Sequence, residues 1–236
     1  RDLIVTGVQT CALPISYTTI IPKPLVPIGG EMPILELVIR QLAHCGFTHI
    51  TLAVNHMANL IIAFFGDGSK WGVHIDYSLE EKPLSTIGPL TLIDDLPESF
   101  IVMNGDILCD LGYRDFLNSH AGSGADVTVA TYKRDMKIDF GVISYNSNNV
   151  IETFSEKPTY HFDVSMGIYG MSRHVVRSLP KGEPYGFDNL MHDGLKNGLK
   201  LAANPFDGFW LDIGRPDDYD YVNENYDTIK TRLGIK

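Results

Sequence analysis

The sequence has few cysteines, few basic side chains and no long apolar segment, and each shortage excludes a class of protein. Only 3 of its 236 residues are cysteines, and their scattered positions lack the paired spacing of a zinc site or a disulfide framework. No apolar run approaches the roughly 18–20 residues that a membrane span requires, and the first residues do not follow the pattern of a signal peptide. We therefore expect a cytoplasmic protein that does not act at a membrane.

Acidic residues outnumber basic ones: the chain has 29 Asp and Glu and 19 Lys and Arg, which give a net charge of −10 at pH 7. Such a balance opposes the broad positive surface that binds nucleic acid. An anionic ligand would need a local cluster of basic groups. The 8 histidines form no HxxxH or HExxH pair, so we interpret them as surface or packing residues.

Hydrophobic residues make up 44% of the chain, which is enough to fill a sizeable core, and no internal repeat or low-complexity linker interrupts it. From Met32 onward, helical and extended periodicities alternate, as is typical of strands and crossover helices that build a mostly parallel sheet. The predicted helices span 33–44, 57–65, 113–120, 173–179, 187–197 and 216–232, with a glycine turn and a helix in 86–96. The predicted strands span 49–55, 73–79, 100–103, 126–132, 164–171 and 209–211, with an antiparallel pair at 142–145 and 150–155.

The first sixteen residues, RDLIVTGVQTCALPIS, resemble a translated sequencing adapter, and the match runs without a gap from Val5 to Ile15. We therefore keep residues 1–16 out of the inference on fold and function and treat residues 17–236 as one domain. The alternative is a genuine first strand at Leu3–Thr6, followed by a glycine turn.

Two apolar strands each end at a carboxylate beside a glycine. Asp106 follows the run FIVM in Asn104-Gly105-Asp106, and Asp212 follows Phe209-Trp210-Leu211. In open α/β sheets, ligands bind outside the carboxyl ends of the strands. Two such carboxylates can hold one Mg²⁺, which completes its shell with water and phosphate oxygens. Alternatively, either aspartate simply caps a helix.

Three loops carry further candidate residues, although each could also be an ordinary surface loop. In PKPLVPIG (22–29), three prolines stiffen the backbone around the cation of Lys23. The loop EEKPLSTIG (80–88) joins a strand to a helix, where exposed backbone N–H groups can meet a base or a phosphate. The third loop, SEKP (155–158), places Glu156 beside Lys157.

Taken in order, the segments YTTIIPKPLVPIG, EEKPLSTIG, VMNGD, SEKP followed by SMGIYGM, and FWLDIGRPDDY resemble the sugar-1-phosphate nucleotidylyltransferases. The resemblance runs from Tyr17 to about Tyr226. It implies a Rossmann-like, three-layer α/β/α sandwich with a mostly parallel mixed sheet. It also implies nucleotidyl transfer from an NTP to a sugar 1-phosphate with Mg²⁺ as cofactor.

The resemblance assigns roles to individual residues. Lys23 matches the lysine that neutralises phosphate charge, and Asp106 and Asp212 match the two magnesium-binding aspartates. The nucleotide-binding positions are Glu81, Thr86 and Gly88. The sugar-phosphate pocket is assigned to Gly141, Glu156, Lys157 and Gly167, where Glu156 would bind sugar hydroxyls and Lys157 would bind the phosphate.

The chain departs from the family pattern at its start. The family pattern opens with a strand and a Gly-rich GGxGTR loop immediately before YTT, and here the adapter-like segment replaces both. Such a loop presents backbone N–H groups to the triphosphate, and its arginine steadies the departing pyrophosphate. We therefore expect impaired activity. Ser85, Ile87 and Ser165 also differ from the common residues, which leaves the base and the sugar open.

Two other functions compete with this prediction. A glycosyltransferase that consumes a nucleotide sugar also holds a metal after a strand, but it typically uses a DxD pair, which Asn104-Gly105-Asp106 is not. A catalytically silent sensor of nucleotide sugars would not need both Asp106 and Asp212. The sequence does not fix the oligomeric state, and a homo-oligomer is compatible with it.

Overall fold

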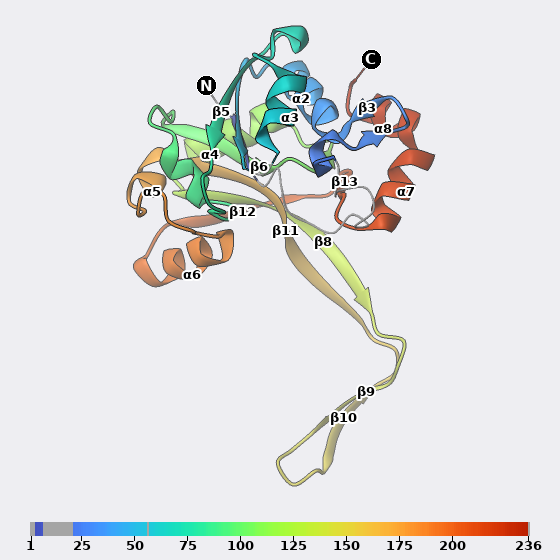
Figure 1. The fold of residues 1–236 in the computed structure, drawn as a ribbon. Coiled ribbons are helices and arrows are strands. Elements are labelled where there is room, and N and C mark those ends of the chain that lie inside the picture. Colours follow the sequence, from blue (N-terminus) through green and yellow to red (C-terminus); the bar gives the residue numbers. More distant parts are fainter. Residues whose placement is uncertain (1–2, 7–20, 56, 236) are drawn as a thin grey trace.

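A computed structural model describes residues 3–6, 21–55 and 57–235 and arranges them around a mixed sheet (Figure 1). Its seven described strands follow the order β12-β8-β11-β6-β1-β4-β5. Their bounds are β1 Leu3–Thr6, β4 His49–Val54, β5 His74–Leu79, β6 Ser99–Asn104, β8 Val127–Lys137, β11 Thr159–Ser172 and β12 Leu201–Phe206. In this sheet β11 is antiparallel to both of its neighbours, while the other pairs are parallel. The expected mostly parallel mixed sheet is confirmed.

Alternate residues of β6 enter two separate cores, because successive side chains of a strand point to opposite faces of the sheet. Ile101 and Met103 belong to the larger core, and Phe100 and Val102 belong to the smaller one. A strand covered on both faces is continuously apolar, which is why FIVM was recognisable in the sequence.

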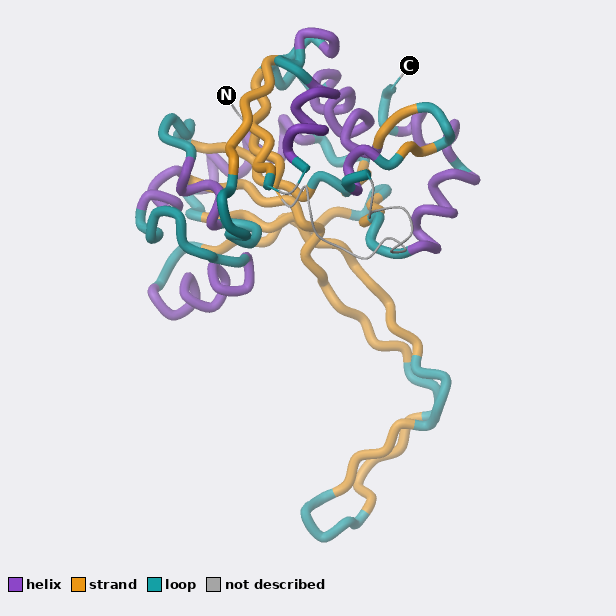
Figure 2. Tube along the Cα trace, in the orientation of Figure 1, coloured by secondary structure: helices purple, strands orange, loops and turns teal. Residues whose placement is uncertain are grey.

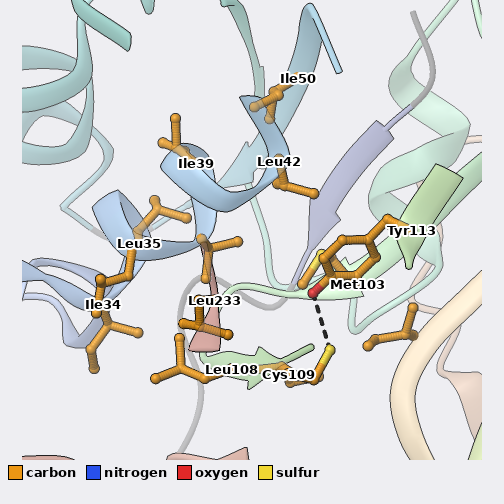
Figure 3. Close-up of a cluster of buried hydrophobic side chains, with 14 of the residues drawn as sticks. Ile34, Leu35, Ile39, Leu42, Ile50, Met103, Leu108, Cys109, Tyr113 and Leu233 are labelled. Atoms are coloured by element: carbon orange, nitrogen blue, oxygen red, sulfur yellow. Dashed lines mark hydrogen bonds between the residues drawn. The ribbon is translucent and has the colours of Figure 1, made fainter. Parts of the chain in front are cut away.

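Helices cover both faces and complete the three layers of the predicted α/β/α sandwich. The larger core is covered by α2 (Ile34–His44), α3 (Ala58–Phe65), α4 (Tyr113–Ser123), α7 (Pro216–Glu224) and α8 (Tyr226–Arg232). The smaller core is covered by α5 (Arg173–Arg177) and α6 (Phe187–Asn197). Figure 3 shows Leu35, Ile39 and Leu42 of α2 in the larger core, near Tyr113, whose hydroxyl lies 3.3 Å from Sγ of Cys109.

A long arm leaves this body (Figures 1 and 2). The last pair between β12 and β8 is Phe206 with Tyr132, and beyond it β8 and β11 continue as a two-stranded ladder to Lys137 and Thr159. The ladder leads into the antiparallel pair of β9 (Val142–Tyr145) and β10 (Ile151–Ser155), as predicted. We call residues 133–164 the arm.

The four residues of β1 occupy the middle of the sheet. Leu3 is in register with Ile50 of β4 on one side and with Ile101 of β6 on the other, both in parallel. The structure thus gives Leu3–Thr6 the place of a strand, as the alternative interpretation expected. The glycine turn expected after it lies outside the described residues, and the adapter-like origin of residues 1–16 stays a prediction.

Several boundaries differ from the sequence prediction. The helix expected over 216–232 is two helices, α7 and α8, which are separated at Asn225. The helix expected in 86–96 is a short 3₁₀ helix, η3 (Gly88–Leu92). The short elements not predicted are η1 (Lys23–Leu25), β2 (Pro27–Ile28), β3 (Met32–Pro33), η2 (Ser69–Trp71) and β7 (Ile107–Cys109), while β13 (Trp210–Asp212) is shifted by one residue.

None of the helices in the described part of the chain is long and apolar enough to cross a bilayer.

Candidate active site

The structure places Asp106 in the turn after β6 and Asp212 at the end of β13, on the same edge of the sheet. A tight turn after Asn104 leads into β7, and β7 pairs antiparallel with β13 so that Asp212 stands opposite Ile107. Ile213, directly after β13, donates its backbone N–H to the carbonyl of Asp106 at 3.1 Å. Two carboxylates from distant parts of the chain therefore share one edge of the sheet.

A buried ion pair joins the proline-rich loop to this edge. Nζ of Lys23 lies 2.5 Å from Oδ2 of Asp106, and the two residues are only 5% and 8% exposed. Lys23 begins η1, whose turn is closed by a hydrogen bond from the N–H of Val26 to the carbonyl of Lys23 at 3.0 Å. A buried charge is tolerated only when it is paired, so the contact fixes both side chains.

Asp106 retains one oxygen that the described residues leave unsatisfied. Its Oδ2 accepts from Lys23, whereas its Oδ1 is buried and has no hydrogen-bond partner among the described residues. Leaving a buried acceptor unpaired is costly. A second cation or a hydrogen-bond donor from a ligand would satisfy this atom.

Asp212 lies at the exposed rim of the same site. Partial desolvation by the surrounding chain, followed by the negative charge of Asp106, raises the pKa of Asp212, and the positive charge of Lys23 opposes this shift. Desolvation is the larger cause of this rise, and the charge of Asp106 adds to it. A divalent cation would offset the charge of both carboxylates.

Gly167 lies beside the same turn. It has a φ of +73°, and a Cβ built on it would stand 2.7 Å from Cδ1 of Ile107 and 3.0 Å from Nδ2 of Asn104. A larger residue would therefore be strained and would press on the turn that carries Asp106. Next to Gly167, the carbonyl of Met166 accepts a hydrogen bond from Nε1 of Trp210 at 3.1 Å, which ties β11 to β13.

The loop after β5 reaches the same edge, since β5 and β6 run in the same direction as β4 and β1. Glu81 is exposed, Thr86 is half-buried and Gly88 is buried. The backbone N–H groups of Ile87 and Gly88 both donate to the carbonyl of Tyr185, at 3.0 and 2.9 Å. Our expectation that the N–H groups of this loop are exposed to a ligand is wrong for these two positions.

The remaining predicted pocket residues lie on the arm and not beside Asp106. A Cβ on Gly141 would stand 3.3 Å from Oε2 of Glu156, so these two positions are neighbours. Glu156 and Lys157 are exposed, and Lys157 has a φ of +44°. Gly167 stands eight residues beyond Thr159 on the continuous strand β11. Eight extended residues span about 26 Å, so the structure splits the four predicted sugar-phosphate residues into two groups.

A second cluster was missed because the histidines were interpreted as surface or packing residues. His49 and His74 begin two adjacent strands and are in direct register. Their Nε2 atoms lie 2.8 and 3.2 Å from the carboxylate of Asp76, and the hydrogen bond from His49 is the main cause that lowers the pKa of Asp76. Such a trio could hold a metal ion. It lies at the amino ends of the strands, on the opposite edge from Asp106.

Comparison with known proteins places the chain in a family. The model of the nucleotidyl transferase family matches residues 7–229, and the chain belongs to this family. The likeness to sugar-1-phosphate nucleotidylyltransferases that the motifs indicated is confirmed.

Curated relatives include the mannose-1-phosphate guanyltransferases of Schizosaccharomyces pombe and Pichia angusta, which are 31% and 33% identical to this chain. The UTP–glucose-1-phosphate uridylyltransferase of Synechocystis sp. is 31% identical. These matches cover 92% of this chain but only 60–61% of each relative. The chain therefore spans about three fifths of the length of these relatives.

Two solved structures share the fold. HddC from Yersinia pseudotuberculosis superposes with a TM-score of 0.74 at 23% identity, over 95% of this chain and 99% of its own. A putative glucose-1-phosphate thymidylyltransferase from Bacillus anthracis gives a TM-score of 0.69 at 23% identity, over 95% and 94% of the two chains. The three-layer α/β architecture is thus shared with these proteins.

The raised pKa of Asp212 predicts that Asp212→Asn stabilises the protein at pH 7. The pKa of this carboxyl in the folded state lies above its ordinary value of 3.8, so its charge opposes folding at neutral pH. This opposition disappears once the pH falls below the pKa that the Asp212 carboxyl has in the unfolded chain.

Thermal unfolding of the metal-free protein should therefore show a higher Tm for the variant at pH 7 and a shrinking gain as the pH approaches 4. Asp217→Asn, on the exposed first turn of α7, is the control and should give no gain. An unchanged or lower Tm for Asp212→Asn at pH 7 would contradict the raised pKa of Asp212.

Proposed function

We propose that the protein transfers a nucleotidyl group from an NTP to a sugar 1-phosphate, which yields an NDP-sugar and pyrophosphate. The names of the guanylyl- and uridylyltransferase relatives support this reaction. The observation that carries the proposal is the buried contact between Lys23 and Asp106, with an unsatisfied Asp106 oxygen beside Asp212. GTP and mannose 1-phosphate are the first substrates to test, because two of the three curated relatives named above are mannose-1-phosphate guanyltransferases.

The donor set at this edge suits Mg²⁺. Magnesium prefers hard oxygen ligands and usually binds through one or two carboxylates while it keeps several waters. The unpartnered Oδ1 of Asp106 and the carboxylate of Asp212 offer such oxygens, and their mutual repulsion favours a cation between them. When bound, the ion would neutralise negative charge on the nucleotide phosphates.

The reaction itself needs no protein nucleophile. A phosphate oxygen of the sugar 1-phosphate attacks the α-phosphorus of the NTP, and the bond to pyrophosphate breaks on the opposite side. Catalysis of such a displacement comes from positioning and from the neutralisation of charge. Lys23 supplies a fixed positive charge at the site and holds Asp106 in place. Gly167 leaves room beside the turn, and Thr86, Gly88 and Glu81 are the proposed contacts of the nucleotide.

The activity test uses pyrophosphate release with Mg²⁺, GTP, UTP or dTTP, and mannose or glucose 1-phosphate. Loss of one group that stabilises developing charge typically costs on the order of 10²–10³ in rate. We therefore expect Asp106→Asn and Lys23→Met each to lose roughly this factor. Lys181→Met is the matched control, because Lys181 forms only an exposed pair with Asp94. Circular dichroism should confirm that each variant is folded.

Turnover by folded Asp106→Asn at the parental rate would refute the metal assignment. Binding of a nucleotide sugar by the parent without turnover would indicate a sensor.

We further propose that residues 1–16 replace the family's first strand and its GGxGTR loop, so that the triphosphate lacks part of its anion site. A chain in which this loop is grafted ahead of Tyr17 should release pyrophosphate faster, by on the order of 10²-fold if it restores one charge-stabilising group. A graft with the arginine replaced by alanine separates the effect of its charge from that of the glycines. No gain from either graft would mean that the segment already present does not limit the activity.

A further inference from the structure

Two histidines and an aspartate face the same side of the sheet where its edge strand begins. β5 is the last strand of the seven-stranded sheet, and its first residue, His74, is in register with His49, the first residue of β4. Residues in register on a parallel pair point to the same face, and so do residues two apart on one strand. Asp76 therefore joins the two histidines. Three side chains with metal-binding groups occupy adjoining positions on a hydrogen-bonded backbone.

These three side chains also converge on one point. Nε2 of His49 lies 2.8 Å from Oδ2 of Asp76, and Nε2 of His74 lies 3.2 Å from Oδ1 of the same carboxylate. The two imidazole rings are 4.6 Å apart between centroids and are tilted by 58°, so they do not stack face to face. One ligand atom from each of the three residues lies within 4.8 Å of the other two. Both rings thus direct the same nitrogen to a common centre.

A zinc ion fits this centre with small movements of side chains. Zn–N and Zn–O bonds of about 2.0–2.2 Å place tetrahedral ligand atoms about 3.3 Å apart, which is close to the two nitrogen–oxygen distances. The side chains of His74 and Asp76 are 54% and 50% exposed, so they can adjust without disturbing the core, whereas His49 is more enclosed at 22%. The chain would supply three ligands and leave the fourth position to water.

We propose that His49, His74 and Asp76 bind one Zn²⁺ ion, which ties the edge strand β5 to β4 at the amino ends of both strands. Two imidazoles and a carboxylate suit Zn²⁺, while Mg²⁺ prefers oxygen ligands. The trio lies at the starts of parallel strands, on the opposite edge of the sheet from Asp106. The zinc site is therefore separate from the proposed catalytic position and does not rest on the proposed function.

Titration calorimetry with Zn²⁺ in excess Mg²⁺ tests the site, because Mg²⁺ competes for positions made of oxygen alone. We expect one Zn²⁺ per chain. Loss of a group that merely orients a metal ligand costs about 10–100-fold in affinity. His74→Gln and Asp76→Asn, which each remove a ligand, should therefore weaken binding by about 100-fold or more. Circular dichroism should show that both variants are folded.

His161→Gln is the matched control for this titration. Nδ1 of His161 lies 2.6 Å from Oδ1 of Asp135, but this exposed pair belongs to no three-residue cluster in the part of the chain that the structure describes. The control variant should bind Zn²⁺ as the parent does. Anomalous diffraction at the zinc edge should place a peak bonded to Nε2 of His49 and of His74 and to a carboxylate oxygen of Asp76.

Thermal unfolding tests the tie between the two strands. An ion that binds only the folded chain stabilises it by mass action, so Zn²⁺ at about 100 times its Kd should raise the Tm by about 5–10 °C for a chain of this size. His74→Gln should lose this rise, and His161→Gln should keep it. A zinc peak at the trio without a rise in Tm would refute the tie.

Three results would overturn the zinc site itself. The first is no binding in excess Mg²⁺, or binding only at millimolar Zn²⁺, which would leave the trio as a hydrogen-bond network. The second is equal affinity in the parent, His74→Gln and Asp76→Asn. The third is an anomalous peak that touches none of the three residues.

Discussion

The buried ion pair between Lys23 and Asp106 is the contact on which the rest of the site depends. It joins a proline-stiffened loop near the start of the described chain to the turn after the central strand β6. Because both residues are almost fully removed from solvent, loss of either partner leaves an uncompensated buried charge, which is strongly destabilising. The pair uses Oδ2 of Asp106, and Oδ1 of the same carboxylate finds no hydrogen-bond partner among the described residues. The proposed binding position and the stability of this edge therefore depend on the same ion pair.

The fold supplies this site with its second carboxylate through a small sheet at the edge of the body. The pairing of β7 with β13 brings Asp212 beside the Asp106 turn, although the two residues are far apart in sequence. The cost of this arrangement is visible in the raised pKa of Asp212, which reflects desolvation and the charge of Asp106. A cation bound between the two carboxylates, as proposed, would offset the repulsion between them.

Much of the body was predictable from local patterns, and the contacts within the site were not. The apolar run of β6 and the helical periodicity of α2 and α6 gave these elements nearly their observed bounds. The edge strand β12 was missed because LAANPF carries a proline and an asparagine, which weaken the strand signal. The arm ladder was missed because KRDMK and TYHFD have no buried face and so no alternation. Lys23 and Asp106 were each candidates, but only the folded chain pairs them, and only strand register brings His49, His74 and Asp76 together.

The central claim is that Asp106 and Asp212 bind one divalent ion, and anomalous diffraction from crystals soaked in Mn²⁺ tests it most directly. Mn²⁺ is chosen because it prefers the same oxygen ligands as Mg²⁺ and can be located by its own scattering. The account predicts an anomalous peak within bonding distance of carboxylate oxygens from both residues. A peak bound to neither aspartate, or found only at the His49, His74 and Asp76 cluster, would contradict it.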